Sequence, residues 1–531
     1  MEAENTKICD QSFSIRRNVL IMTRITLLLL VHAFSATQCA NILGVTSMIS
    51  HSHHLWNEKL AEGLLKNGHN VTLLSHDKAK IKHMNYTVIQ LEGGYEKIHE
   101  LFDYEESFSQ PESADISNFW KVIGLICAHD LSTEGLKTLM KYPEDYKFDL
   151  IIWDLNSGEC LYPLIKRFGN PPVVGVSPFG LQPYISYMMG SHYFNYIPFY
   201  GTSYTGGAMS FWERISNTLS INYLTYVRIN SYLPTMQTLA YEHFGSSLTE
   251  PALEVERNFS LALVNSDAIF NFPEALAPNI IPVGGLHIEP AKPIQKDLRK
   301  VFESTNGVII FSLGSNIQAE FLNDNMMNNF NRCFETLPYT FILKYNNTHQ
   351  RKFPKNVITR PWLQINDILG HPKTKLFISH GGALSTQEAM YHGVPIVGIP
   401  FFVDQLGNIA KLVERKIAER LEFDKLSPEY ICQKIKTVLE NSTYYENVQL
   451  ISRRVKDQQN TPLQRAVFWI EYILRNGNGE HLSLAARDMY TFQTLNIDII
   501  GLVAVLIATA LLLVYLVYII FLKQINKVKV D

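Results

Sequence analysis

The chain has 531 residues, which is too long for a single hydrophobic core and predicts two or more domains. An apolar content of 46% with 18% charged residues is typical of a globular protein that also carries membrane-embedded segments. A net charge of −3 gives no support to a nucleic-acid partner. Six cysteines in a chain of this length exclude a disulfide-dense scaffold.

The first 40 residues have the pattern of a secretory signal region. Three arginines precede a short apolar core at 25–31, and small residues follow up to Ala40. The core is too short to span a bilayer, and whether the chain starts at Met1 or Met22 stays open. An oxidising compartment would permit a Cys127–Cys160 disulfide, which no feature of the sequence supports. Entry into the secretory pathway would also make five sequons available for glycosylation, at Asn70, Asn85, Asn258, Asn346 and Asn441.

The next segment predicts a parallel α/β sheet. Residues 41–48 read as a strand, 55–66 as a helix and 70–74 as a second strand, without the GxGxxG of a dinucleotide site. The loop before the helix holds three histidines in four residues, but no further ligand follows at metal-site spacing. A later apolar strand ends at Asp154, which on the residues alone is most simply a helix cap. Residues 179–212, rich in Tyr, Phe and Met, suit a core, a membrane-contacting surface or the wall of a broad apolar pocket.

The second half repeats the pattern and adds a candidate anion site. A strand at 307–313 leads into Gly314, and residues 377–405 read as strand, glycine turn, helix, strand and loop. A helix that begins directly after a glycine turn offers free N–H groups to an anion. His380 stands beside this turn, where it can donate to a phosphate, and Glu388 lies about two turns into the helix, where it can accept from a sugar diol.

The spacing of residues 377–405 matches a known signature. The matching positions are His380, Gly381, Gly382, Glu388, Pro395, Pro400, Asp404 and Gln405. On these residues the chain resembles the UDP-glycosyltransferases, and the resemblance extends over nearly its whole length. It implies an α/β GT-B fold, in which two Rossmann-like domains face each other across a cleft. The acceptor-binding domain would occupy 41–283 and the UDP-sugar-binding domain 284–495.

The resemblance also implies a catalytic pair and a donor site. The general base would be His53, with His54 as the neighbouring alternative, and Asp154 would orient it. Trp362 would stack on uracil, Glu388 would hold the ribose, and the other donor-site positions would hold the diphosphate and the sugar. The whole donor set is Gly314, Ser315, Trp362, Ser379, His380, Gly381, Gly382, Ser385, Glu388, Asp404 and Gln405. The UDP-sugar is a co-substrate, and neither a cofactor nor a metal is expected.

Three positions in two segments depart from the family pattern. Gln364 and Ile365 replace the usual Pro-Gln after Trp362, so one nucleotide contact is missing unless Gln364 substitutes for it. Leu384 stands where many relatives have Asn. Ile365 is the only support for the alternative of a membrane-anchored binding protein that keeps the fold without chemistry. The retained site residues count against it, namely His53, Asp154, His380, Glu388, Asp404 and Gln405. A soluble oxidoreductase is disfavoured because the dinucleotide fingerprint is missing.

The chain ends in a predicted transmembrane helix at 499–522, which would span about 36 Å at ~1.5 Å per residue. Lys523 and Lys527 place the tail, 523–531, in the cytosol by the positive-inside rule, and the last five residues resemble a dilysine retrieval signal. We therefore expect a single-pass glycoprotein of the endoplasmic reticulum membrane with lumenal catalytic domains. Whether it forms a homo-oligomer stays open.

The expected activity is transfer of a hexose to a hydroxyl of a small lipophilic acceptor, with inversion at the anomeric carbon, as in detoxification. Local variants at 52–57 and 384–386 resemble the invertebrate branch of the family. They favour glucose as the donor sugar, with glucuronic acid second.

Overall fold

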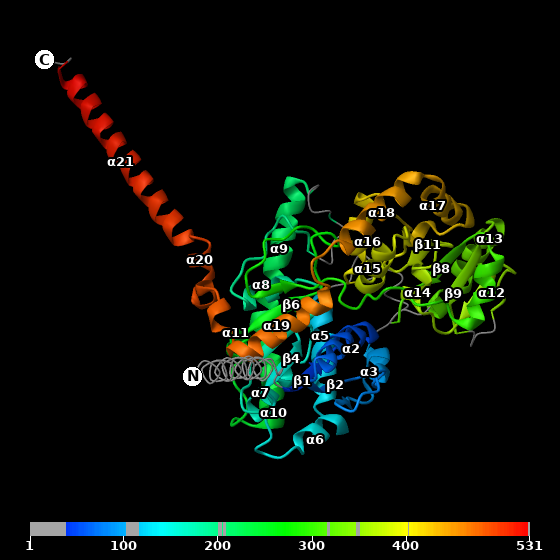
Figure 1. Cartoon of the computed structure of the whole chain (residues 1–531). Helices are drawn as coiled ribbons and strands as arrows, with labels where there is room; N and C mark the ends of the chain where they lie inside the picture. The colour runs from blue at the N-terminus through cyan, green and yellow to red at the C-terminus, as the bar shows by residue number, and fades with distance from the viewer. Residues whose placement is uncertain are drawn as a thin grey trace, which may run out of the picture.

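The computed structural model describes residues 39–101, 116–199, 204, 209–315, 319–346, 351–401 and 403–528. The predicted signal peptide, apart from its last two residues, and the final three residues of the predicted tail lie outside these ranges. The described chain contains two parallel sheets, each with helices packed around it, and a long helix that leaves the body of the molecule (Figure 1).

The first sheet has the strand order β3-β2-β1-β4-β5-β6-β7, and all its pairings are parallel. The order reverses direction between β1 and β4, where Ile42 lies opposite Leu150. Both β4 and β5 are buried along their whole length, as apolar strands covered by helices on two faces must be. The strands are β1 (Asn41–Thr46), β2 (Asn70–Ser75), β3 (Tyr86–Gln90), β4 (Leu150–Asp154), β5 (Val173–Ser177), β6 (Leu261–Val264) and β7 (Ile280–Pro282).

The second sheet has the order β10-β9-β8-β11-β12-β13 and is also parallel. Its order reverses between β8 and β11, and such reversal points are where doubly wound sheets bind ligands. The strands are β8 (Val308–Ser312), β9 (Thr340–Lys344), β10 (Val357–Arg360), β11 (Thr374–Ser379), β12 (Ile396–Gly398) and β13 (Ala418–Arg420).

The helices between these strands fall into the same two groups. Those that follow the first-sheet strands are α2 (His51–Lys66), α3 (Gly94–Leu101), α5 (Ile116–Asp130), α6 (Glu134–Met140), α7 (Pro163–Arg167), α8 (Pro183–Met188), α9 (Phe211–Val227), α10 (Leu233–Phe244) and α11 (Ala252–Arg257). Those around the second sheet are α12 (Lys296–Ser304), α13 (Asp324–Thr336), α14 (Ile365–Leu369), α15 (Ala383–His392), α16 (Gln405–Glu414), α17 (Pro428–Glu440) and α18 (Ser442–Lys456).

Helix α2 begins four residues earlier than the sequence predicts. Ser50 adopts an extended conformation as its N-cap, so all three histidines of the expected loop lie in the helix, at its first turn. Polar residues are tolerated there because the first-turn N–H groups have no partner within the helix. The candidate base is therefore held by regular structure rather than by a flexible loop.

Helix α19 (Pro462–Asn476) returns to the first domain, although the sequence places it within the predicted second domain. Val467 and Ile470 join the core formed by α2, which includes Trp56 and Leu60. The two helices approach so closely that a Cβ on Gly63 would lie 2.7 Å from Val467 Cγ2. Figure 1 accordingly shows α19 beside the first sheet, well apart from α18.

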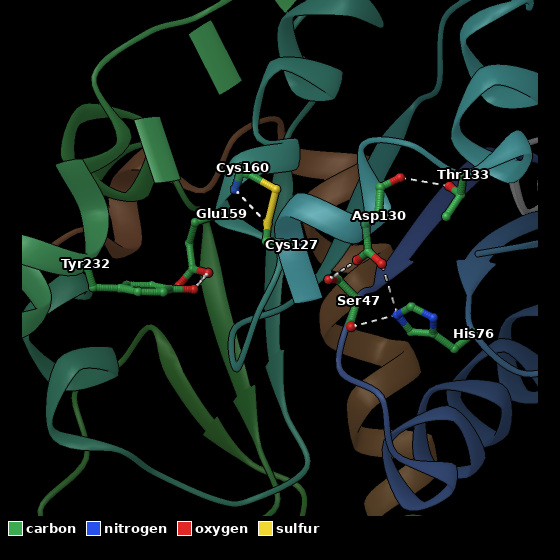
Figure 2. Close-up of a disulfide and its surroundings, with 8 residues drawn as sticks. All are labelled: Ser47, His76, Cys127, Asp130, Thr133, Glu159, Cys160 and Tyr232. Atoms are coloured by element: carbon green, nitrogen blue, oxygen red, sulfur yellow. Dashed lines mark hydrogen bonds and ion pairs between the residues drawn. A yellow bond between two sulfur atoms is a disulfide. The ribbon is translucent and has the colours of Figure 1, made fainter. Parts of the chain in front are cut away.

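Two disulfides bridge helices to neighbouring elements. Cys127–Cys160 joins α5 to the turn after β4 (Figure 2). The sequence permitted this pairing but contained no feature in its support. Cys333–Cys432 joins α13 to α17 and was not predicted, because the two residues are 99 positions apart. Among the described cysteines, Cys39 is free and exposed.

Helix α21 (Ile497–Val528), which follows the short α20 (Thr491–Thr494), contains the predicted span at 499–522. Residues Ile497–Ile525 are long and apolar enough to cross a membrane. The helix points away from both domains in Figure 1, and its large apolar side chains are exposed.

Candidate active site

The predicted catalytic pair forms at the reversal point of the first sheet. His53 Nδ1 lies 2.7 Å from Asp154 Oδ2, because α2 starts just beyond the end of β1 and Asp154 ends the adjacent β4. The amide of Asn57 donates to the same carboxylate oxygen at 3.3 Å, and the backbone N–H of Asn156 donates to the other at 3.1 Å. The carboxylate is thus fixed by three contacts and in turn fixes the imidazole.

This arrangement leaves Nε2 of His53 available. Nε2 is buried and has no hydrogen-bond partner among the described residues. The ring of Phe179 meets the imidazole edge to face, at 4.6 Å between centroids. A ring whose Nδ1–H is donated to a carboxylate presents Nε2 as an acceptor, which is the state a general base requires.

The neighbouring histidines have other partners. His51 Nδ1 contacts Asp77 at 2.5 Å, and its ring stacks on Tyr95. His54 Nδ1 lies 3.0 Å from Ser75 Oγ, and burial lowers the pKa of His54. The three side chains therefore diverge. Within the ranges that the structure describes, no group of three or more His, Cys, Asp or Glu is placed to hold a metal ion.

The glycine turns of the second sheet pack around His380. Gly314 and Gly381 have φ values of 91° and 89°, which glycine adopts without strain. A Cβ on Gly314 would lie 2.6 Å from the His380 ring, and one on Gly382 would lie 2.5 Å from it. Both turns therefore need glycine, because the imidazole fills the space between them.

His380 is neutral in this setting. Burial lowers its pKa to about 3, with a further contribution from the ammonium of Lys344. Lys344 Nζ donates to the carbonyl of Gly314 at 2.6 Å, so this cation lies at the glycine turn after β8. Nδ1 of His380 is buried, and the described part of the chain offers it no hydrogen-bond partner.

The predicted serines hold the turns in shape. Ser379 Oγ accepts from the N–H of Gly381 at 3.1 Å, and Ser385 Oγ donates to the carbonyl of Gly382 at 3.2 Å. Ser379 is fully buried, whereas Ser315 is half-buried beside Gly314. Their contact with a diphosphate stays a prediction.

Trp362, the predicted uracil platform, is 50% exposed and lies in the loop after β10. Lys344 Nζ lies 4.6 Å from the centroid of its ring. Ile365 begins α14 and packs against the apolar core of the second domain, while Gln364 caps that helix and is exposed. The departure from the family pattern thus replaces an amide with a side chain that packs into the core.

Glu388 lies on α15 and is largely buried. Burial, together with a smaller effect of the nearby Asp367, raises its pKa to about 8. His287, on the segment that enters the second domain, has Nε2 at 4.0 Å from Glu388 Oε1 and at 3.2 Å from the carbonyl of Leu384. The carboxyl group is therefore protonated near neutral pH in the absence of a ligand.

Asp404 is the N-cap of α16 and Gln405 is the first residue of this helix, at the end that faces the cleft. Gln405 Oε1 accepts from the N–H of Phe401 at 2.8 Å, and Asp404 Oδ2 accepts from Asn408 at 2.6 Å. Burial raises the pKa of Asp404, while Asn408, Lys411 and His53 oppose the shift. Asp404 lines the same pocket as Phe179, whose ring contacts His53, so the candidate base on the first domain lies near the predicted sugar end on the second.

An open pocket lies between these groups. Phe179, Tyr193 and Phe199 line it from the first domain, and Asp404 and Lys411 line it from the second. Part of the aromatic stretch at 179–212 therefore forms a pocket wall, one of the three alternatives that the sequence left open. The last residues of this stretch do not belong to the wall, because Phe211 and Trp212 are exposed on α9.

Sequence reasoning missed Asn57 and Lys411. Asn57 follows His53 by four positions and so lies on the same helix face, which is a signal that the sequence does contain. The place of Lys411 in the pocket depends on how the two domains face each other, which no local pattern indicates.

Several solved glycosyltransferases share this architecture. The kitacinnamycin glycosyltransferase aligns with a TM-score of 0.56 at 16% identity, over 82% of this chain and all of that one. A UDP-glucosyltransferase from Polygonum tinctorium aligns with a TM-score of 0.54 at 15% identity, over 83% and 99% of the two chains. The likeness shows the fold, and the predicted GT-B architecture is confirmed.

The sequence comparisons identify the family of the chain. The family model "UDP-glucoronosyl and UDP-glucosyl transferase" matches residues 41–530. Human UDP-glucuronosyltransferase 2B10 is 31% identical over 519 residues, which cover 93% of this chain and 95% of that protein. UDP-glycosyltransferase UGT5 of Dactylopius coccus is 30% identical over 483 residues, covering 90% and 91%. The chain belongs to this family and is a UDP-glycosyltransferase, which confirms the resemblance.

Proposed function

We propose that this enzyme transfers a hexose from a UDP-hexose to a hydroxyl of a small lipophilic acceptor, with inversion and with His53 as the general base. The observation that carries the proposal is the 2.7 Å contact of His53 Nδ1 with Asp154, which leaves Nε2 free as an acceptor. The acceptor would enter through the aromatic pocket, whose wall includes the Phe179 that touches His53.

The chemical step follows from these positions. The acceptor O–H gives its proton to Nε2 as its oxygen attacks the anomeric carbon from the face opposite the leaving group. The bond between that carbon and the phosphate oxygen breaks, UDP leaves with the electron pair, and an α-linked donor gives a β-glycoside. Asp154 stabilises the imidazolium that forms. General-base assistance of this kind contributes roughly 100- to 10,000-fold.

The donor would lie along the second domain. Uracil would stack on the half-exposed ring of Trp362, and Glu388 would hold the ribose hydroxyls. The neutral imidazole of His380 can donate an N–H to the diphosphate, and the N-terminus of α15 offers unpaired N–H groups beside it. Asp404 and Gln405 would bind sugar hydroxyls nearest to His53.

Glucose is the proposed sugar, on the local variants at 52–57 and 384–386. Glucuronic acid is the alternative, because several relatives are named UDP-glucuronosyltransferases. Microsomes containing the protein should be incubated with UDP-glucose, UDP-glucuronic acid, UDP-galactose and UDP-N-acetylglucosamine and one phenol, and the product examined by NMR. A β-glucoside supports the proposal. An α-linked product contradicts inversion, and donor binding without any transfer favours the binding-protein alternative.

The proposed location is the endoplasmic reticulum membrane, with the catalytic domains in the lumen and one span at α21. The apolar length of Ile497–Ile525 and the lysines that follow it support this topology. Protease added to sealed microsomes should remove only the short tail. Digestion of the two domains without detergent would contradict the lumenal orientation.

A further inference from the structure

The loop between β2 and β3 reaches from the first domain to the predicted uracil platform of the second. Nζ of Lys80, on this loop, lies 5.5 Å from the centroid of the Trp362 ring. Lys344 of the second domain lies 4.6 Å from the same ring. An ammonium at these distances is attracted by the negative face of an indole. Two cations from two domains therefore converge on one aromatic side chain.

The loop is held in place by the helix that carries the candidate base. Glu58 lies on α2 and is buried, and its Oε1 accepts from the backbone N–H of Lys80 at 2.7 Å and of Ile81 at 3.2 Å. At the start of the same loop, Asp77 contacts His51 at the first turn of α2. The position of Lys80 is therefore fixed relative to His53 by backbone contacts, while its own side chain remains exposed.

Both ammonium groups lie near the Trp362 ring, and that of Lys344 also contacts the glycine turn after β8. Lys344 donates to the carbonyl of Gly314 and lies close enough to His380 to lower its pKa. Burial lowers the pKa of Lys344 to about 8, with Lys80 adding to this shift and Glu320 opposing it. Like charges that approach each other are stabilised by an anion bound between them. A UDP-sugar brings such an anion as its diphosphate.

We propose that Lys80 is a donor-binding residue supplied by the first domain, whose ammonium pairs with the diphosphate of the UDP-sugar across the cleft. This inference rests on the donor site proposed above. It assigns the donor a second role, because a diphosphate held by Lys344 on one side and Lys80 on the other ties the two domains together. Through Glu58, the same contact holds α2, and with it His53, toward the sugar.

The test compares the affinity for UDP with that for uridine, which lacks the diphosphate. Both are measured by calorimetry on the detergent-solubilised full chain. A contact with the diphosphate affects only the affinity for UDP, whereas a contact with the base or ribose affects both. Lys80→Ala should weaken UDP about 10-fold, which corresponds to about 1.4 kcal/mol and is close to the lower end of the range for a hydrogen bond to a charged group. Uridine affinity should stay unchanged, and Lys80→Arg should restore most of the UDP affinity. Lys82→Ala is the matched control, since Lys82 is an exposed lysine two positions along the same loop.

Two results would overturn the inference. One is equal UDP affinity in Lys80→Ala and Lys82→Ala, which would leave Lys80 as a surface lysine. The other is an equal loss of affinity for uridine and for UDP in Lys80→Ala, which would show that Lys80 acts on the base stacked at Trp362 instead of on the diphosphate. Trp362→Ala tests the donor site itself. If that variant keeps wild-type affinity for UDP, the donor site is wrongly placed, whereas loss in Trp362→Ala without loss in Lys80→Ala rejects Lys80 alone.

Discussion

Nδ1 of His53 and Oδ2 of Asp154 lie 2.7 Å apart although 101 positions separate the residues in the chain. The contact arises because β1 and β4 are parallel neighbours, so the elements that follow them meet at one edge of the sheet. Both side chains are buried, and Asn57 and Asn156 complete the hydrogen bonds of the carboxylate. The pair is therefore rigid before any substrate binds.

Removal of the imidazole should abolish most transfer to hydroxyl acceptors. We expect His53→Ala to lower turnover on a phenol by roughly 100- to 10,000-fold, because the proton then has no positioned acceptor. UDP affinity should be unchanged, since His53 is not among the residues proposed to hold UDP. A thiol acceptor, which is partly ionised near neutral pH, should lose much less.

The controls are His51→Ala and His54→Ala, whose side chains have other partners. Both should keep turnover within a few-fold of wild type on the same phenol. If His54→Ala loses turnover while His53→Ala keeps it, the base is the neighbouring histidine. If all three variants keep it, general-base catalysis by this helix is wrong.

Asp154→Asn should also lower turnover while leaving the fold intact, because the amide is nearly isosteric with the carboxylate. It removes the charge that stabilises the imidazolium, and an amide that presents its NH₂ to Nδ1 would favour the tautomer with Nε2–H, which cannot accept a proton. The measurement is kcat on phenol and thiol acceptors, with thermal unfolding as the check on folding. An equal loss on both acceptors would indicate a structural role instead of a contribution to proton transfer.

The two ends of the donor site should respond differently to substitution. Asp404→Ala should raise the KM for the UDP-sugar and leave UDP affinity largely unchanged, because Asp404 lines the pocket together with Phe179, which contacts His53. Trp362→Ala and Glu388→Ala should weaken UDP itself. Titration of each variant with UDP and kinetics with the sugar donor distinguish the ends. Equal loss of UDP affinity in all three variants would show that the ends are wrongly assigned.

The features that the sequence predicted correctly depend on local pattern. Strand β11, the glycine turn and helix α15 follow from an apolar run, two glycines and a C-terminal Gly393 in the left-handed conformation. The start of α2 was missed, because a run of Ser and His has low helix propensity and only its tertiary partners favour the helix.

Long-range relationships were not predictable in the same way. The amphipathic pattern of α19 is visible in the sequence, but the pattern does not say that its apolar face packs on α2. The position of Lys80 beside Trp362 likewise depends on the contact between two domains. His53 and Asp154 were found through the resemblance, since the residues alone indicated only a loop histidine and a helix cap.

The Cys333–Cys432 disulfide should stabilise the second domain. It closes a segment with a sequence separation of 99, and cross-links of that length restrict the unfolded chain strongly. We expect the Cys333→Ala, Cys432→Ala double variant to lose about 2–4 kcal/mol of unfolding free energy. Calorimetry of oxidised wild type, reduced wild type and the variant provides the check. If the oxidised wild type and the double variant have the same melting temperature, this bridge adds no stability.

The buried carboxyl of Glu388 should make stability depend on pH in a direction that a surface carboxylate does not. Its pKa is raised to about 8 in the folded state, first by burial and then by Asp367, whereas a carboxyl in the unfolded chain titrates near ~4.3. Between these values the folded state binds one more proton than the unfolded state. Its contribution to stability therefore falls as the pH rises from about 4.3 to about 8.

Glu388→Gln removes this titration while keeping the shape of the side chain. The melting temperature of the variant should exceed that of wild type by an amount that grows with pH up to about 8 and then levels off. Thermal unfolding at several pH values between 5.5 and 8.5, without donor, measures the difference. Glu446→Gln is the control, since Glu446 is exposed on α18, and it should shift stability equally at every pH. A difference for Glu388→Gln that is constant across the range would mean that this carboxyl is ionised in the folded enzyme at every pH tested.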